Sequence, residues 1–231
     1  MNFRMIAVVA AVLTLGSVMV PAADDLAAVL AKMDDSSTKF KSAQADITSD
    51  NVQLQPIPDT DTQKGTIIFQ RTGGELKMAL HLKTDNGKPV PKDVVYAGGV
   101  LKFYEPLQKQ LQVFKAGSKR DQADTILTLG FGGSGKDLLK AWDVTYAGSE
   151  QVNGKQTAKL QLVPKDAQMK NTFPKVILWV DSATGTTVKQ QFFDGSGNYR
   201  LATYDNLKLN GSVAGNAFDL KTASGTQVVN H

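Results

Sequence analysis

Apolar side chains change their spacing along this chain. From Leu26 to Phe40 they recur every three or four positions, which predicts an amphipathic helix. Asp24 and Asp25 come just before it, where the positive end of the helix dipole favours acidic residues. Three hydroxyl residues, Ser36–Thr38, interrupt the apolar face, and we expect them to break or loosen the helix.

From Ser42 onward the apolar period is two, and the alternating runs end at Gly, Asn, Asp or Pro. Turn sequences such as Asp85–Gly87, Asn153–Gly154 and Asp194–Gly197 tolerate positive φ and are typical of hairpins. The pattern therefore predicts mainly antiparallel β structure. The expected strands are Ala43–Leu54, Lys64–Thr72, Glu75–Thr84, Asp93–Ala97, Val100–Glu105, Gln110–Phe114, Asp143–Gln151, Lys155–Pro164, Lys175–Asp181, Thr187–Asp194, Tyr199–Leu209 and Ala217–Leu220.

Only the interior stretch 119–142 departs from this alternation. Its apolar residues, including Ile126, Leu129, Leu138 and Trp142, have helical spacings on both sides of a glycine-rich turn. We expect two short helices there. About a dozen short strands with few helices predict a mainly β (α+β) fold, one strongly curved sheet or a barrel, because closure or a cover protects sheet edges.

The N-terminus has the pattern of an export signal. A basic start ending at Arg4 is followed by an apolar run, and Ala22 with Val20 offers a cleavage site. The run is shorter than the roughly 20 residues that a spanning helix needs. We expect residues 1–22 to be a cleaved signal peptide and residues 23–231 to form one domain, since sheets of this kind commonly reach such lengths as single domains.

Composition narrows the candidate chemistry. The chain has no cysteine, which excludes disulfides, thiolate metal sites and lipidation at the cleavage site. A net charge of +4 is spread along the chain without aromatic clustering, so nucleic-acid binding is disfavoured. His81 and His231 are the only histidines, which disfavours a hydrolytic triad or a zinc site. We expect no cofactor, no metal and no catalytic residues.

A phosphate-loop frame, GxxxxGK, spans Gly130 to Lys136 and runs into the second short helix. The next residue is Asp137, whereas a phosphate loop has Ser or Thr there to bind magnesium. We interpret the segment as a flexible connection or hinge between two helices, with Asp137 capping the second helix.

The strands present a wide apolar face. Alternation places Arg71 on the same face as apolar neighbours of its strand. A few short helices can hardly cover a dozen strands, so a partly unfilled apolar cavity is expected. A guanidinium buried there is costly without partners, and Arg71 is a candidate latch between sheet and lid. The expected lining is Ile67, Phe69, Met78, Leu80, Leu82, Leu101 and Phe103.

The order of several segments resembles the LolA-like family of outer-membrane lipoprotein carrier proteins. Lys64 to Arg71, which reads Lys-Gly-Thr-Ile-Ile-Phe-Gln-Arg, is similar to the family's glycine–strand–Lys-Arg-Pro signature. Leu101 to Pro106 is similar to its Leu-x-Phe-Tyr-x-Pro. The chain departs from the pattern at Thr72, where the family has proline, and in a first hairpin expanded around Pro56 and Pro58.

The resemblance implies an incomplete antiparallel half-barrel with an α-helical lid over an apolar cavity. It further implies a monomeric, non-enzymatic periplasmic carrier of lipoprotein acyl chains, loaded by an inner-membrane transporter and unloaded to an outer-membrane acceptor. Arg71 takes the position of the arginine that hydrogen-bonds to the closed lid.

Two other functions remain open: a carrier of another lipid or hydrophobic ligand, and a non-catalytic envelope sensor that binds a partner protein. A cluster of acid–base residues in the cavity would instead favour an enzyme.

Overall fold

The computed structural model describes residues 22–117 and 120–231. The signal peptide expected over residues 1–22 lies outside them, apart from its last residue. Among the helices of the described part, none combines the length and apolarity needed to cross a membrane. The elements are α1 Ala22–Lys39, β1 Ser42–Gln53, β2 Asp59–Thr72, β3 Glu75–Asp85, β4 Lys88–Ala97, β5 Val100–Glu105, β6 Gln110–Lys115, α2 Arg120–Thr128, α3 Gly135–Ala141, β7 Trp142–Val152, β8 Lys155–Pro164, α4 Ala167–Thr172, β9 Lys175–Asp181, β10 Thr187–Phe193, β11 Tyr199–Leu209 and β12 Gln227–Asn230.

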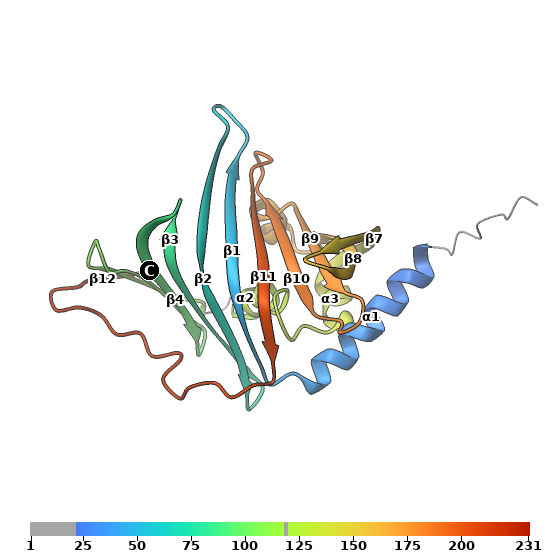
Figure 1. The fold of residues 1–231 in the computed structure, drawn as a ribbon, viewed down its shortest axis with the longest axis horizontal. Coiled ribbons are helices and arrows are strands. Elements are labelled where there is room, and N and C mark those ends of the chain that lie inside the picture. Colours follow the sequence, from blue (N-terminus) through green and yellow to red (C-terminus); the bar gives the residue numbers. More distant parts are fainter. Residues whose placement is uncertain (1–21, 118–119) are drawn as a thin grey trace, which may run out of the picture.

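The strands form one open sheet of 12 strands in the order β12-β6-β5-β4-β3-β2-β1-β11-β10-β9-β8-β7. Every pair is antiparallel except β12 with β6, which run parallel. Two meanders, β1–β6 and β7–β11, meet where β1 pairs with β11, and the long central strands stand in front of α2 and α3 (Figure 1). The structure confirms the expected α+β fold, a curved sheet that does not close, with helices on it.

The register of the central strands aligns apolar side chains across the sheet. Ile67 lies opposite Leu80 and Phe69 opposite Met78, while Leu80 lies opposite Val94 on its other side. Residues directly opposite one another project from the same face. One continuous apolar surface therefore crosses β2, β3 and β4, as the alternation predicts.

The N-terminal helix does not break where the sequence suggested. α1 continues through Ser36–Thr38 to Lys39, so that expectation is wrong. The Thr38 hydroxyl donates to the Asp35 carbonyl at 2.8 Å within the helix, and the Ser37 hydroxyl donates to the Gly132 carbonyl at 2.7 Å. The hydroxyls thus have partners compatible with helical backbone, so they do not compete for it.

The C-terminal strand lies elsewhere than expected. Ala217–Leu220 forms a turn and coil, and the last strand is β12. All four residues of β12 are exposed, so it has no alternation to reveal it in the sequence. Its place at the edge of the sheet depends on β6, more than a hundred residues earlier in the chain.

Two strand boundaries and one short helix differ from the sequence-based expectation. β2 begins at Asp59 and β4 at Lys88, earlier than the predicted Lys64 and Asp93, because these polar hairpin ends pair with their neighbours although they bury nothing. The short helix α4 was not predicted at all. Its N-cap is Asp166, whose side chain accepts from the Met169 amide at 2.7 Å.

Candidate functional site

An apolar cavity of about 500 Å³ opens on the inner face of β1–β5 and β10–β11. All seven side chains that the sequence analysis assigned to a ligand-binding face line it: Ile67, Phe69, Met78, Leu80, Leu82, Leu101 and Phe103. They come from three strands, β2, β3 and β5. The structure brings the whole predicted set to one place, whereas their role in binding stays a prediction.

Other elements complete the wall of the cavity. α2 contributes Ile126 and Leu127, and Gly130 follows shortly after that helix. The remaining lining residues are Ile47, Ser49, Asn51, Gln63, Lys92, Val94, Gln190, Phe192, Arg200, Ala202 and Tyr204. These residues were not predicted as lining, although the alternation of Ile47, Ser49 and Asn51 in β1 indicates the same face. The contribution of β10 and β11 depends on the pairing of distant strands.

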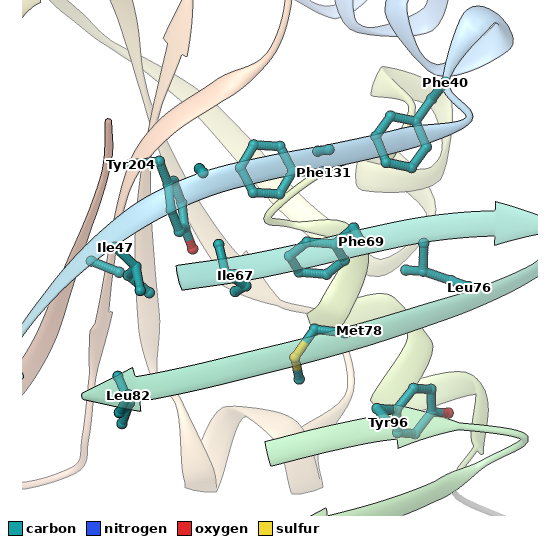
Figure 2. Packing of buried hydrophobic residues seen from close by; sticks show 13 residues of the cluster. Phe40, Ile47, Ile67, Phe69, Leu76, Met78, Leu82, Tyr96, Phe131 and Tyr204 are labelled. Atoms are coloured by element: carbon teal, nitrogen blue, oxygen red, sulfur yellow. The ribbon is translucent and has the colours of Figure 1, made fainter. Parts of the chain in front are cut away.

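Three aromatic rings pack together beside the cavity, and two of them, Phe69 and Tyr204, also line it. Phe131 is 1% exposed and lies between Phe69, at 5.2 Å between ring centroids, and Tyr204, at 5.0 Å. Figure 2 shows these rings with Ile47, Ile67 and Met78 on the strands around them. Edge-to-face and tilted rings at these separations attract one another beyond simple burial. The lid loop, residues 129–134 between α2 and α3, is thus anchored to the sheet by an aromatic cluster.

Arg71 joins the sheet, the lid loop and the end of α1. Its Nη2 donates to the Gly132 carbonyl at 2.8 Å, and its Nη1 lies 3.5 Å from the Ser37 carbonyl. Its guanidinium carbon stands 5.4 Å from the centroid of the Phe40 ring, close enough for a cation–π attraction. The predicted contact between Arg71 and the lid is present. Its role as a latch that gates release stays a prediction.

A second tether, which no sequence pattern indicates, holds α2 to the sheet. The Tyr96 hydroxyl in β4 donates to Asp124 Oδ1 in α2 at 2.6 Å. Burial, followed by the hydrogen bond to Asp124, raises the pKa of Tyr96, so the phenol keeps its proton and remains a donor. Arg120 adds weaker ion pairs to Glu75, at 3.9 Å, and to Asp124, at 3.8 Å.

The glycine-rich loop is packed tightly in this conformation. At Gly132, whose φ is +80°, a Cβ would stand 2.5 Å from Phe40 Cδ1, and at Gly135 it would stand 2.5 Å from the Leu30 carbonyl oxygen. Gly133 is equally close to Thr128. Gly135 thus permits close approach to α1, Gly132 to Phe40 just after it and Gly133 to the end of α2, so packing accounts for these glycines without a phosphate ligand. Whether the segment acts as a hinge stays a prediction.

The cap of α3 differs from the expected one. Ser134 is the N-cap, and its hydroxyl oxygen accepts from the Asp137 amide at 3.0 Å. The Asp137 carboxylate accepts in turn from the Ser134 hydroxyl at 2.7 Å and from Lys140 at 2.8 Å. Asp137 therefore lies in the first turn, where the helix dipole also favours it, and the assignment of Asp137 as the cap is wrong.

The open end of the cavity is polar. Ser49, Asn51 and Gln63 line it together with two cations, Lys92 and Arg200. Lys92 lies 3.6 Å from Asp85. The described residues that line the cavity include no Asp, Glu or His, and within the described ranges no group of three potential metal-ligating side chains occurs. His81 pairs instead with Asp93 at 2.7 Å, and its position between Leu80 and Leu82 places it on the outer face.

Comparison with known proteins gives matches chiefly in structure. A sequence model of a family described only as an uncharacterized protein matches residues 133–217. No curated protein matches the chain in sequence. An uncharacterized conserved protein from Thermus thermophilus has 11% identity and a TM-score of 0.55, and the match covers 91% of this chain and 100% of that chain.

The crystal structure of MucB has 16% identity and a TM-score of 0.51, covering 89% of this chain and 66% of MucB. In the MucA/MucB complex of Pseudomonas aeruginosa the match covers 63% of that chain, with a TM-score of 0.49. This chain thus spans less than two thirds of MucB in that complex. An outer membrane lipoprotein-sorting protein domain from Vibrio parahaemolyticus has 13% identity and a TM-score of 0.45, covering 86% of this chain and 97% of that chain.

Identities this low indicate a shared fold and nothing finer. The fold shared with the Thermus protein and MucB extends over most of this chain. The chain itself has the open antiparallel sheet, the inner-face helices and the apolar cavity. At the level of the fold, the chain is similar to the Thermus protein and to MucB, and the open half-barrel that the resemblance of its sequence segments implies is the architecture observed.

Proposed function

We propose that this chain is a carrier of the cell envelope that holds the acyl chains of lipoproteins in its cavity between the inner and the outer membrane. The observation that supports it most is the convergence of seven apolar side chains from three strands on one partly enclosed space of about 500 Å³. Volumes of this size are typical of small-molecule sites. Each buried methylene contributes about 0.8 kcal/mol to binding, so a single acyl chain buried in the cavity gains useful affinity from its apolar surface.

Release is assigned to the lid. Arg71 makes one short hydrogen bond from the sheet to the lid loop, at 2.8 Å, and Tyr96 makes one to α2, at 2.6 Å; the lid loop and α2 together form the lid. A hydrogen bond contributes about 0.5–1.5 kcal/mol net, so a few of them form a barrier that a membrane partner can overcome. In this proposal Arg71 is the latch, and Arg71→Leu leaves the fold intact while changing the rate of cargo release.

The test is to mix the mature protein with a purified acylated lipoprotein and to look for a soluble complex by size exclusion. We expect a complex with the wild type and none with Leu80→Glu, which puts a charge into the cavity. Leu209→Glu is the matched control, because Leu209 is 37% exposed outside the cavity. Absence of a complex with the wild type would remove the main support for the proposal.

The expected location and the lack of catalysis belong to the same proposal. Export rests on the signal-like residues 1–22, and the non-catalytic role is part of what the resemblance to the carrier family implies. A shuttle between two membranes also requires a protein that is free to diffuse, as a monomer cleaved near Ala23 would be. Mass analysis of the exported protein tests the cleavage site directly.

A second candidate is an envelope sensor module that binds a partner protein. It is favoured by the structural likeness to MucB, which has been crystallised with MucA. Affinity capture from the envelope separates the two candidates, since a sensor would retain one stoichiometric protein partner in a form without acyl groups. Mass spectrometry of extracted lipids separates a lipoprotein carrier from a carrier of another hydrophobic ligand.

A further inference from the structure

One buried amide interrupts the apolar wall of the cavity. Gln190, in β10, is 8% exposed and lines the cavity. Its Nε2 donates to the Tyr204 hydroxyl, while its Oε1 has no hydrogen-bond partner in the described part of the chain. Buried polar atoms nearly always have a partner, and one without a partner costs stability. The missing partner of Gln190 Oε1 therefore requires a physical explanation.

Tyr204 provides the other half of this polar pair. It lies in β11 opposite Ile47 and packs against Phe131, 5.0 Å between ring centroids (Figure 2). Burial raises the pKa of Tyr204, so the phenol keeps its proton. Among the described residues its O–H has no acceptor of its own. The pair thus leaves one free acceptor and one free donor in a wall that is otherwise largely apolar.

We propose that the ligand of this cavity is a lipid chain that carries a hydroxyl group, bound between Gln190 and Tyr204. The inference rests on the proposed function, since it specifies the chemistry of the same ligand. A hydroxyl donates one hydrogen bond and accepts others, so it satisfies Gln190 Oε1 and the Tyr204 O–H together. It also matches the amide in either of its two orientations. A simple alkyl chain would leave both groups unpaired.

The position of Gln190 and Tyr204 in the cavity indicates which part of the lipid chain they contact. Gln190 lies opposite Ala202, and Phe192 lies opposite Arg200 at the open, polar end. Two residues along a strand span about 7 Å. Arg200 is exposed and forms no ion pair with any described residue. Arg200 is thus available to an anionic lipid head group. Gln190 and Tyr204 then contact the lipid chain some distance from that head group.

The alternative explanation is a buried water molecule that donates a hydrogen bond to Gln190 Oε1. A buried water typically makes about three hydrogen bonds, and Gln190 Oε1, the Tyr204 hydroxyl and Ser49, which lies opposite Ala202 in the register, are the polar groups that it would need. A water would give no preference for hydroxylated chains. The two accounts therefore differ in a property that can be measured.

The experiment compares the binding of hexadecanoic acid with a series of hydroxyhexadecanoic acids, by titration calorimetry on the full mature protein. The hydroxyl is moved stepwise from the carboxylate end toward the methyl end. We expect one position to bind about five- to tenfold tighter than hexadecanoic acid, the gain of about one well-placed hydrogen bond. Chains hydroxylated elsewhere should bind more weakly than hexadecanoic acid.

Variants assign the preference to the pair. Gln190→Leu and Tyr204→Phe should lose the preferred position while binding hexadecanoic acid within about twofold of the wild type. Gln191→Leu is the matched control, because it makes the same change at the next residue, which faces the other side of the sheet, and it should keep the preference. If Gln190→Leu does not fold, Tyr204→Phe and the wild-type series carry the test.

Each result decides a different question. If hexadecanoic acid binds and no hydroxylated chain binds tighter, the hydroxyl inference is wrong and the carrier proposal stands. If the preference survives in Tyr204→Phe and in Gln190→Leu, the pair is not its origin and the inference is likewise wrong. If no chain binds at all, the proposed function fails, and the inference fails with it.

Discussion

The two halves of the sheet bury their inner faces in different ways. On β8 and β9 the side chains of Leu160, Leu162, Val176 and Leu178 are completely buried, in a cluster that includes Leu30 from α1 and Leu138 from α3. On the β1–β5 side, Leu80, Val94 and Leu101 remain partly exposed around a cavity of about 500 Å³. We call the β8–β9 side the closed half and the β1–β5 side the open half.

The difference lies in the helices and not in the strands. Both halves have apolar residues on the inner face, but α1 and α3 contact each other and β7, whereas α2 has no buried residue of its own. Where two helices cover the sheet, its inner face becomes a filled core. Where a single amphipathic helix covers it, a cavity remains. The same pattern of residues can therefore serve stability in one half and binding in the other.

The largest expected effect tests the closed half by truncation. Leu160→Ala should lower the free energy of unfolding by about 2–5 kcal/mol, because it leaves a cavity in a filled core. Leu80→Ala, the same change on a wall that already borders empty space, should cost less than about 2 kcal/mol. Urea denaturation measures both. Equal losses would mean that the two halves are packed alike.

Enlarging a side chain should show the reverse contrast. Val176→Phe adds a ring to the closed half and should cost about 1–3 kcal/mol through overpacking. Ala202→Phe adds the same ring to the cavity wall, where there is room, and should change stability by less than about 1 kcal/mol. It should also abolish binding of hexadecanoic acid. If Ala202→Phe binds the chain as tightly as wild type does, the cavity is not the binding site.

The lid loop, which borders both halves, is tested at a glycine. Gly132→Ala combines a φ of +80° with a contact of 2.5 Å to Phe40, and strain of this kind costs about 1–3 kcal/mol. Gly197→Ala has a similar φ of +85° with no atom within 4 Å, so it isolates the backbone contribution. We expect Gly132→Ala to be the more destabilising in thermal unfolding. Equal shifts would show that the loop is not tightly packed against α1.

The smallest effect is a pH dependence in α3. The hydrogen bond from Lys140, and then that from Ser134, lowers the pKa of Asp137 below its ordinary value of 3.8. A depressed carboxyl pKa stabilises the fold above that ordinary value, and the stabilisation is lost as pH falls through the folded pKa. Because the pair is exposed, Asp137→Asn should cost less than about 1 kcal/mol at neutral pH.

Urea unfolding at neutral pH and at pH below 3.8 measures this contribution. The difference between wild type and Asp137→Asn should vanish in acid, and Lys140→Gln should show a similar but weaker dependence. A difference that persists unchanged in acid would assign the effect of Asp137→Asn to packing instead of charge.

The sequence predicted the cavity wall well where local rules decide it. Ile67, Phe69, Met78 and Leu80 lie in consecutive strands joined by a tight turn, so alternation and hairpin pairing fix both their face and their neighbours. Leu101 and Phe103 follow by the same rule two strands later. Each of these assignments needs only a period of two and a short connection.

The parts that the sequence analysis missed depend on distant segments. β12 is recognisable only from its parallel pairing with β6, and the tether from Tyr96 to Asp124 joins a strand to α2. The contact of Gln190 with Tyr204 follows from the register of β10 and β11. None of these contacts leaves a periodic signal, because each involves single polar residues or an exposed strand.

The sequence by itself determined the fold class, the inner face of the first meander and a candidate latch at Arg71, because the two-residue period and the lone guanidinium are local properties of the chain. The tertiary structure alone decided which half of that face would be filled. The reason is that α1 and α3 reach β7 while α2 leaves space above β2–β5. The unpaired Oε1 of Gln190 in that space is likewise a consequence of packing, and it makes the chemistry of the ligand testable.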